Sequence, residues 1–258
     1  MDPASLIGLV AALAAIFTMM ILEGADPMSI FLPAPLILVW GGTIAVGIAG
    51  HTLKDVIGSY KAVPKALFSK APDPGKTVET IVGLSERARR EGLLALEDAA
   101  RDIDDPFLRQ GLQAAIDGTD PEDLRIILED KIASKRTQDR MHAKYFTDMG
   151  GYGPTIGIIG TVISLVHVLE NLADPSSLGH MIAAAFVATL WGILSANVVW
   201  LPFAARIKRI SDMECAQMEV TLEGLLAVQA GANPRTVGER LRSLLPPGGE
   251  KAAEKEAA

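Results

Sequence analysis

The chain has 258 residues, of which 49% are hydrophobic and 21% are charged, and its formal net charge is −7. This acidic balance, without a basic face, excludes nucleic acid as an expected partner. The single cysteine, Cys215, excludes an internal disulfide and is typical of a protein from a reducing compartment.

Four long apolar runs follow one another along the chain, at residues 6–22, 32–48, 153–169 and 178–203. Each approaches the ~20 residues that an α-helix needs to cross the hydrocarbon core of a bilayer. The fold class predicted from this pattern is all-α, a polytopic membrane protein with four transmembrane helices and a helical cytoplasmic domain. The alternative is a buried hairpin of core helices in a soluble protein.

The distribution of basic residues indicates the orientation of these spans. All 24 Lys and Arg lie within residues 54–144 and 206–255, and both short links between paired spans carry only acidic charge. The positive-inside rule then places both termini in the cytoplasm. We expect a multi-pass protein of the inner (cell) membrane. The shared charge asymmetry of both helical pairs argues against the soluble alternative.

The remaining sequence predicts packed cytoplasmic helices. Helix starts are indicated by Asp105-Pro106, Asp120-Pro121 and Asn233-Pro234, because Asp or Asn suits the N-cap and Pro the first turn. Gly92, Gly118 and Gly231 indicate helix ends. The predicted organisation is transmembrane helices one and two at 1–51, a cytoplasmic helical domain at 52–152, transmembrane helices three and four at 153–203, a cytoplasmic helical extension at 204–247, and a disordered tail at 248–258.

A glycine-rich run opens the third span at residues 150–161. It does not predict a phosphate-binding loop, because no Gly-Lys-Ser/Thr follows. Gly153, Gly157 and Gly160 instead predict close approach of another helix, since small residues drive helix packing in lipid.

Two spans each place one hydroxyl on a face of small residues. Thr161 shares a face with Gly157 and Pro154, and Thr189 shares one with Ala185 and Gly192. A lone threonine in a span commonly bonds back to its own helix. Two matched hydroxyls favour a shared polar seam.

The four spans contain no Asp, Glu, Lys or Arg. Ion carriers commonly place an ionisable group within the membrane. If ions cross the membrane here, the titrating group is therefore expected from another chain. His167 lies near the outer end of the third span, and we assign it a packing or interfacial role. No catalytic constellation, metal-ligand spacing or cofactor motif is present, so we do not expect an enzyme.

These residues resemble the MotA/TolQ/ExbB ion-channel group, and within it the flagellar stator family MotA. The resemblance rests on the segment 152–162 with 166–169, on 89–97 (Arg-Arg-Glu-Gly-Leu-Leu-Ala-Leu-Glu), on Ala188-Thr189-Leu190-Trp191-Gly192, on Pro202 and on Asn233-Pro234-Arg235. It extends along nearly the whole chain, and four spans favour MotA over the three-span TolQ and ExbB relatives.

The resemblance implies a mechanical role. MotA subunits form a homo-oligomer, held to be a pentamer, around a dimer of the single-span, peptidoglycan-anchored subunit MotB. Ion flow turns this ring, which pushes on the rotor protein FliG and drives motility. Carried over by motif, Thr161 and Thr189 line the ion path, Pro154 and Pro202 couple ion uptake to movement, and Arg89 and Glu97 contact FliG. The charged pair could equally be a helix-end residue and a solvated surface residue.

Two departures bear on the ion. Gly151 stands where many stators have Asp, so no role is carried onto nearby Asp148. Ala188 stands where sodium-type members of the PomA kind tend to have a second Thr, which favours H⁺ over Na⁺ as the transported ion. The alternatives are a sodium-driven stator, a TolQ/ExbB-like energiser of an envelope or transport machine, and a membrane scaffold without ion flow.

Overall fold

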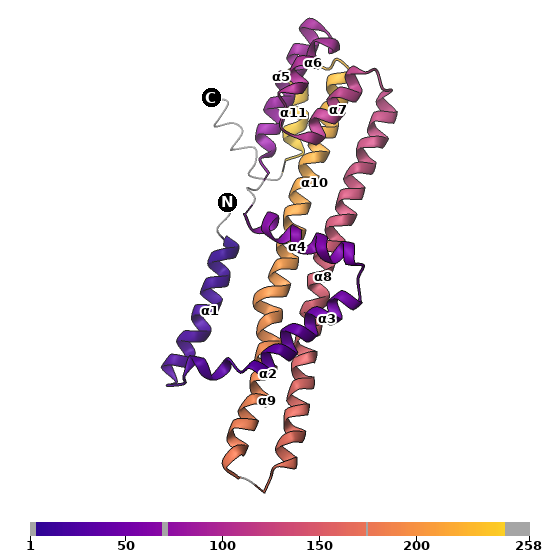
Figure 1. Ribbon diagram of the computed structural model, residues 1–258. Coiled ribbons are helices and arrows are strands. Elements are labelled where there is room, and N and C mark those ends of the chain that lie inside the picture. The colour runs from indigo at the N-terminus through magenta and orange to yellow at the C-terminus, as the bar shows by residue number, and fades with distance from the viewer. Residues whose placement is uncertain (1–3, 69–71, 174, 246–258) are drawn as a thin grey trace. The chain divides into compact units, whose positions relative to one another are not determined.

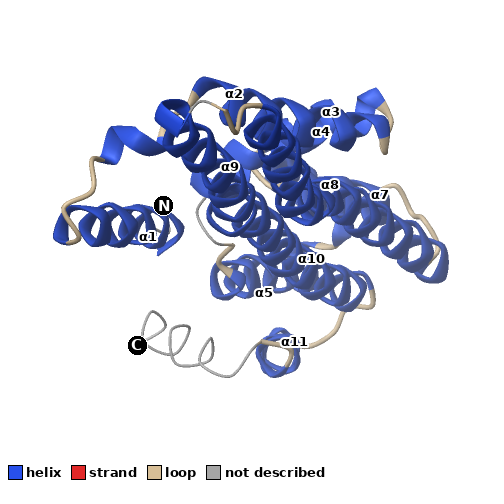
Figure 2. Cartoon of the chain, turned by 90° about the horizontal axis from the view of Figure 1, so that it is seen from below, coloured by secondary structure: helices blue, strands red, loops and turns tan. Residues whose placement is uncertain are grey.

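The computed structural model describes residues 4–68, 72–173 and 175–245, and each regular element in that part of the chain is a helix (Figure 1; Figure 2). The chain divides into two compact units, each made from two separate stretches. Unit 1 comprises Met1–Lys70 with Asp139–Ile210, and unit 2 comprises Ala71–Gln138 with Ser211–Ala258.

Unit 1 contains the apolar helices. Two longer helices, α8 (Pro121–Glu170) and α10 (Leu201–Gln229), belong to it only in part. Its other elements are α1 (Ala4–Leu22), η1 (Pro27–Ile30), α2 (Pro33–Leu36), the π-helical turn η2 (Ile37–Gly41), α3 (Gly42–Ala49), α4 (Leu53–Phe68), α9 (Pro175–Ser195) and the π-helical turn η4 (Ala196–Trp200).

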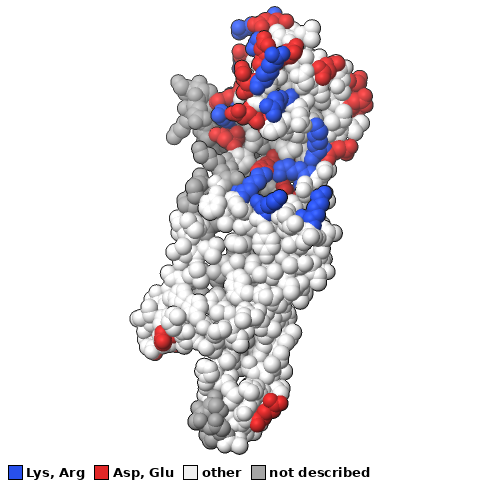
Figure 3. All heavy atoms as spheres, in the orientation of Figure 1, with Lys and Arg blue, Asp and Glu red and all other residues white. Residues whose placement is uncertain are grey.

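The four predicted spans all lie on helices of this unit. Two helical runs, Pro121–Glu170 and Leu178–Gln229, contain windows long and apolar enough to cross a membrane, and two shorter apolar stretches are Leu6–Leu22 and Pro33–Ala49. Large apolar side chains such as Ile7, Ile163 and Phe186 are 63%, 59% and 68% exposed. Figure 3 shows a wide face of this unit without charged side chains. Such a surface is typical of one covered by lipid or by other subunits.

An aromatic cluster forms the core of unit 1. On α8 it lies just before the third apolar run begins. Tyr145, Phe146 and Met149 are fully buried and pack with Trp200 and with the inner face of α4. The Phe146 and Trp200 rings are stacked at 6.4 Å, and Trp40 meets Trp200 edge-on at 5.1 Å. Aromatic pairs of this kind add to the free energy gained from burial alone. With the Tyr60 ring of α4, which meets Phe146 edge-on, they connect η2, α4, α8 and the end of the fourth span.

Unit 2 is a helical bundle whose element ends follow from its sequence. Asp73, Asp105 and Asn233 cap three of its helices by accepting hydrogen bonds from backbone N–H groups in the first turn, and each is followed by Pro. Its elements are α5 (Pro74–Glu91), η3 (Leu93–Leu96), α6 (Glu97–Arg101), α7 (Pro106–Ile116), α11 (Pro234–Ser243), the beginning of α8 and the later part of α10.

Gly92, Gly118 and Gly231 follow three helices of unit 2 at φ values of 87°, 82° and 66°. Because this left-handed region favours glycine, the predicted helix ends are confirmed. The predicted starts at Asp105-Pro106, Asp120-Pro121 and Asn233-Pro234 are confirmed too.

The core of unit 2 is aliphatic. Ile81, Leu96, Leu112 and Leu225 are completely buried in one cluster. Charged side chains link α8 and α10 around it: Arg125 Nη1 lies 3.1 Å from Glu223 Oε1, and Lys135 Nζ lies 2.7 Å from Glu214 Oε2. The hydrogen bond with Glu223 raises the pKa of Arg125 above its ordinary value.

The predicted disordered tail, residues 248–258, lies outside the described residues. The division into domains at 51, 152, 203 and 247 stays a prediction.

Candidate functional site

The two membrane threonines meet. The Oγ1 atoms of Thr161 on α8 and Thr189 on α9 are hydrogen-bonded to each other. Thr161 Oγ1 also lies 3.1 Å from the carbonyl oxygen of Gly157 and 3.0 Å from that of Ala185. A hydroxyl carries one proton, so Thr161 can donate to one of these carbonyls while it accepts from Thr189. When the hydrogen bonds are arranged in this way, the Thr189 hydroxyl oxygen can still accept a hydrogen bond from a protonated group.

The sequence allows two interpretations of these threonines: a hydrogen bond back to their own helix, or a polar seam shared between two spans. The geometry shows both. Thr161 makes the bond back to its own helix through Gly157, and it also bridges to α9 through Ala185 and Thr189. The side chains of Thr161 and Thr189 are partly exposed. The polar seam is therefore reachable from outside this chain.

Glycines bring the two helices together on either side of the seam. A Cβ atom built on Gly157 would lie 2.8 Å from the carbonyl oxygen of Ala188, and one on Gly192 would lie 2.7 Å from that of Gly153. Real Cβ atoms do not approach backbone so closely, and backbone cannot yield as a flexible side chain can. The predicted close helix approach at Gly153 and Gly157 is confirmed, with α9 as the neighbour (Figure 1). Gly160 contacts Ala188 and also Leu38 of η2.

Pro154 lies in an unbroken helix. α8 continues through it for 50 residues, although proline supplies no N–H to the carbonyl of Gly150 four residues earlier. A Cβ on Gly150 would lie 2.6 Å from Leu201 Cδ2, in the residue directly before Pro202. The structure thus places the proline-weakened turn of α8 against the start of α10.

Pro202 follows a π-helical turn that the sequence did not indicate. In η4 the N–H of Leu201 donates to the carbonyl of Ala196, five residues back. Pro202 cannot bond to Val198 in the regular α-helical pattern, so the wider turn and the proline occur together. Irregular turns of this kind in a long helix commonly occur at functional sites.

Arg89 and Glu97 belong to unit 2. Arg89 is in the last turn of α5 and Glu97 is the first residue of α6, with Gly92 and η3 between them. Both side chains are exposed, and Glu97 Oε1 pairs with Arg101 Nη2 at 3.2 Å. Figure 3 shows basic and acidic side chains interspersed over this unit.

Comparison with known proteins relates this geometry to a family. The profile described as "MotA/TolQ/ExbB proton channel family" matches residues 99–220. Motility protein A of Bacillus subtilis is 37% identical over 253 residues, which cover 95% of this chain and 92% of that protein. The chain belongs to the MotA/TolQ/ExbB proton channel family.

Other members of this family match over similar lengths. Chemotaxis protein PomA of Vibrio alginolyticus is 33% identical, covering 95% of this chain and 96% of that protein. The flagellar MotAB stator complex from Bacillus subtilis contains a chain that matches with a TM-score of 0.88 and 34% identity, covering 96% of this chain and 98% of that chain. The chain is thus a flagellar stator protein of the membrane, a polytopic helical channel-family member and not an enzyme.

A polar cluster that sequence reasoning did not assign lies beside the core of unit 1. His51 Nε2 lies 3.4 Å from Asp148 Oδ2, and Lys144 Nζ lies 2.6 Å from the same oxygen. Tyr145 packs edge-on against His51, and burial, with its hydrogen bond to Tyr60, raises the pKa of the Tyr145 phenol well above its ordinary value. Asp148 is therefore paired in this structure, which no sequence pattern indicated.

Metal ligands do not gather in the parts of the chain described here. Within residues 4–68, 72–173 and 175–245, no group of three or more His, Cys, Asp or Glu could hold a metal ion. The chemistry that this arrangement supports is hydrogen bonding by the threonine hydroxyls and main-chain carbonyls between α8 and α9.

Proposed function

We propose that Thr161 and Thr189 form part of a proton path whose titrating carboxyl group comes from a MotB-like partner. The observation that carries this proposal is the hydrogen-bonded threonine pair on a glycine seam, in spans without an Asp, Glu, Lys or Arg. A carboxyl group that protonates and deprotonates next to this pair finds a hydroxyl oxygen that can accept its proton in a hydrogen bond.

Membership of the family supports the proposed partner and assembly. The related Bacillus subtilis chain was solved as part of a MotAB stator complex. We infer that several copies of this chain, in a ring of five, surround a dimer of a single-span subunit anchored to peptidoglycan. The exposed apolar faces of α8 and α9, with Ile158, Val162 and Phe186, would be covered by neighbouring copies, partner helices and lipid.

The transported ion in this proposal is the proton. Ala188 is buried, and its Cβ would lie 2.9 Å from a Cβ built on Gly160. A second hydroxyl at position 188 would therefore enter a tight helix contact. With only the pair at 161 and 189, the path offers few oxygens to replace the hydration of a sodium ion.

The orientation of the chain is also proposed. Lys and Arg flank only one side of the spans, so both termini are assigned to the cytoplasm. Unit 2 would then be cytoplasmic, with Arg89 and Glu97 exposed for contact with the rotor protein FliG. Pro154 and Pro202, joined through the Gly150–Leu201 contact, would transmit ion-driven movement of the spans along α8 and α10.

Complementation tests this function. The chain is expressed together with its cognate single-span subunit in a bacterium that lacks its own stators. We expect swimming to be restored, to persist without added sodium, and to be abolished by Thr161→Val together with Thr189→Val. Swimming speed that rises steeply with sodium concentration would refute proton drive, and normal swimming of the double variant would refute the assigned path.

A further inference from the structure

One hydroxyl in the third span has no hydrogen-bond partner. Ser164 lies on α8 three residues after Thr161, and its side chain is partly exposed. Residues 153–169 and 178–203 all belong to the described chain, and among their hydroxyl and amide side chains Ser164 alone makes no hydrogen bond. The bonded side chains are those of Thr155, Thr161, Thr189, Ser195 and Asn197.

The missing bond of Ser164 indicates a partner in another chain. A serine or threonine hydroxyl within a helix commonly donates to the carbonyl four residues earlier, as Thr161 does to Gly157 at 3.1 Å. Ser164 and Gly160, both within the described chain, are not bonded in this way. A hydroxyl without a partner in the membrane costs free energy, and such groups commonly bond across to another helix.

Ser164 lies beside the threonine pair. It follows Gly157 by seven residues, or about two helical turns, so both residues lie on the face of α8 that packs against α9. Residues three apart on a helix are neighbours, with Cβ atoms ~5–6 Å apart. One carboxyl group of a partner helix can therefore reach the hydroxyl of Ser164 or that of Thr189 with a small movement.

The threonine pair and Ser164 have opposite capacities for hydrogen bonding. The proton of Thr161 is directed at a main-chain carbonyl, and the proton of Thr189 is directed at Thr161. The pair can therefore accept a further hydrogen bond but has no proton left to donate. Ser164 still has its proton to donate. A carboxylate only accepts hydrogen bonds, whereas a protonated carboxyl group can also donate one.

We propose that Ser164 donates a hydrogen bond to the deprotonated carboxyl group of the partner subunit. The carboxylate would be held at Ser164, and after taking up a proton it would donate that proton in a hydrogen bond to the oxygen of Thr189. Ser164 would thus stabilise the charged state and set the proton concentration at which uptake occurs. This inference rests on the proposed proton path.

The ionisable side chains nearest to Ser164 along the two helices lie at the helix ends. His167 and Glu170 are 63% and 68% exposed, and His167 Nδ1 lies 3.7 Å from Glu170 Oε2. Asn171 also bonds to His167, and His180 is exposed near the start of α9. His167 is the closest of these residues in sequence, so its contribution has to be measured separately.

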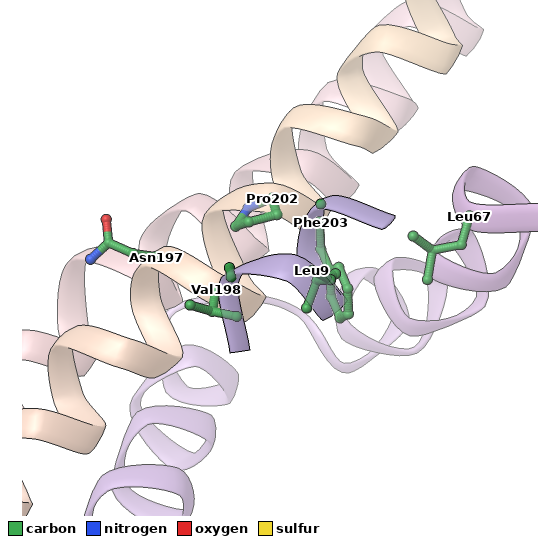
Figure 4. Close-up of a pocket in the computed structure, with 8 residues that line it drawn as sticks. Leu9, Leu67, Asn197, Val198, Pro202 and Phe203 are labelled. Carbon is green, nitrogen blue, oxygen red and sulfur yellow. The ribbon is translucent and has the colours of Figure 1, made fainter. Parts of the chain in front are cut away.

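A cavity beside the fourth span does not suit a carboxylate. Its volume is about 280 Å³, and its lining beside Pro202 is apolar apart from Asn197 (Figure 4). Asn197 Nδ2 donates to the carbonyl of Ile193 in its own helix at 2.9 Å. A charged group placed among the apolar side chains would lose its hydration, which costs much free energy. This contrast favours Ser164 as the group that receives the carboxylate.

The pH dependence of proton flux tests this donor. Vesicles contain the chain with its partner subunit locked open, and flux is measured over a series of pH values at a constant pH difference across the membrane. Loss of the donor destabilises the carboxylate relative to its protonated form. Ser164→Ala should therefore raise the pH of half-maximal flux by about 1 unit, as expected for one hydrogen bond to a charged group. Ser164→Thr keeps the hydroxyl and should restore the wild-type midpoint.

Two control variants accompany this measurement. Ser195→Ala removes a buried hydroxyl that bonds to the Gly192 carbonyl, and His167→Gln removes the nearest titratable side chain; both should leave the midpoint unchanged. Lower flux at every pH with an unmoved midpoint in Ser164→Ala would show a merely structural role and overturn the proposal. An equal shift in His167→Gln would overturn it too.

The proposed path and the proposed donor can fail separately. Wild-type flux through Thr161→Val with Thr189→Val would refute the path itself. Loss of flux in that double variant, together with a wild-type midpoint in assembled Ser164→Ala complexes, would refute the donor alone.

Discussion

A Cβ atom on Gly157 would lie 2.8 Å from the carbonyl oxygen of Ala188, so this glycine sets the distance between α8 and α9. Gly157→Ala should force the helices apart and lower the thermal stability of the purified complex, at a cost of ~1–3 kcal/mol typical of overpacking. Gly151→Ala is the control, because nothing lies within 4 Å of a Cβ at Gly151. Equal melting temperatures for the two variants would contradict the close packing.

The turn before Pro202 offers a second test. Pro202→Ala restores an N–H that can bond to the carbonyl of Val198, which should favour a regular α-helix over the π-helical turn of η4. We expect normal assembly, slower hydrogen exchange across residues 196–203 and reduced swimming speed. Pro64→Ala in α4, also a proline within a helix, serves as the control. Slower hydrogen exchange with unchanged swimming speed would contradict a role of this turn in coupling ion uptake to movement.

Charge reversal tests the rotor contact. Arg89→Glu and Glu97→Lys change exposed side chains, whose ion pairs contribute only ~0–1 kcal/mol to folding, so the complex should assemble. We expect most swimming to be lost in each variant, and partial recovery when a compensating charge is introduced in FliG. The control pair is Arg235→Glu and Glu239→Lys, an exposed ion pair on α11. The same loss in the control pair would point to general charge sensitivity of unit 2.

The core of unit 2 predicts a stability difference. Leu112 is fully buried, so Leu112→Ala should destabilise the protein by ~2–5 kcal/mol through lost burial and a cavity. Leu94, 75% exposed on η3, is the matched control, and Leu94→Ala should leave the unfolding midpoint nearly unchanged. A midpoint for Leu112→Ala within experimental error of the wild type would contradict the assigned core.

Local rules predicted the elements and part of the site. Asp-Pro and Asn-Pro pairs mark helix starts because capping depends on neighbours in sequence, as Asp105 and Asn233 show. The meeting of Thr161 and Thr189 could be anticipated because each shares a face with small residues. In contrast, the π-helical turn at Ala196–Trp200, the Gly150–Leu201 contact and the His51–Asp148 pair depend on which helices become neighbours. No local pattern encodes those choices.

The most direct test measures proton flux. Vesicles containing the chain with a partner subunit locked open receive a pH gradient, and an internal pH-sensitive dye reports the rate of acidification. We expect Thr161→Val with Thr189→Val to abolish flux, whereas Thr161→Ser, which keeps the hydroxyl bonded to Thr189, should largely preserve it. Wild-type flux through the double valine variant, in complexes shown to be assembled, would contradict a proton path along this threonine pair.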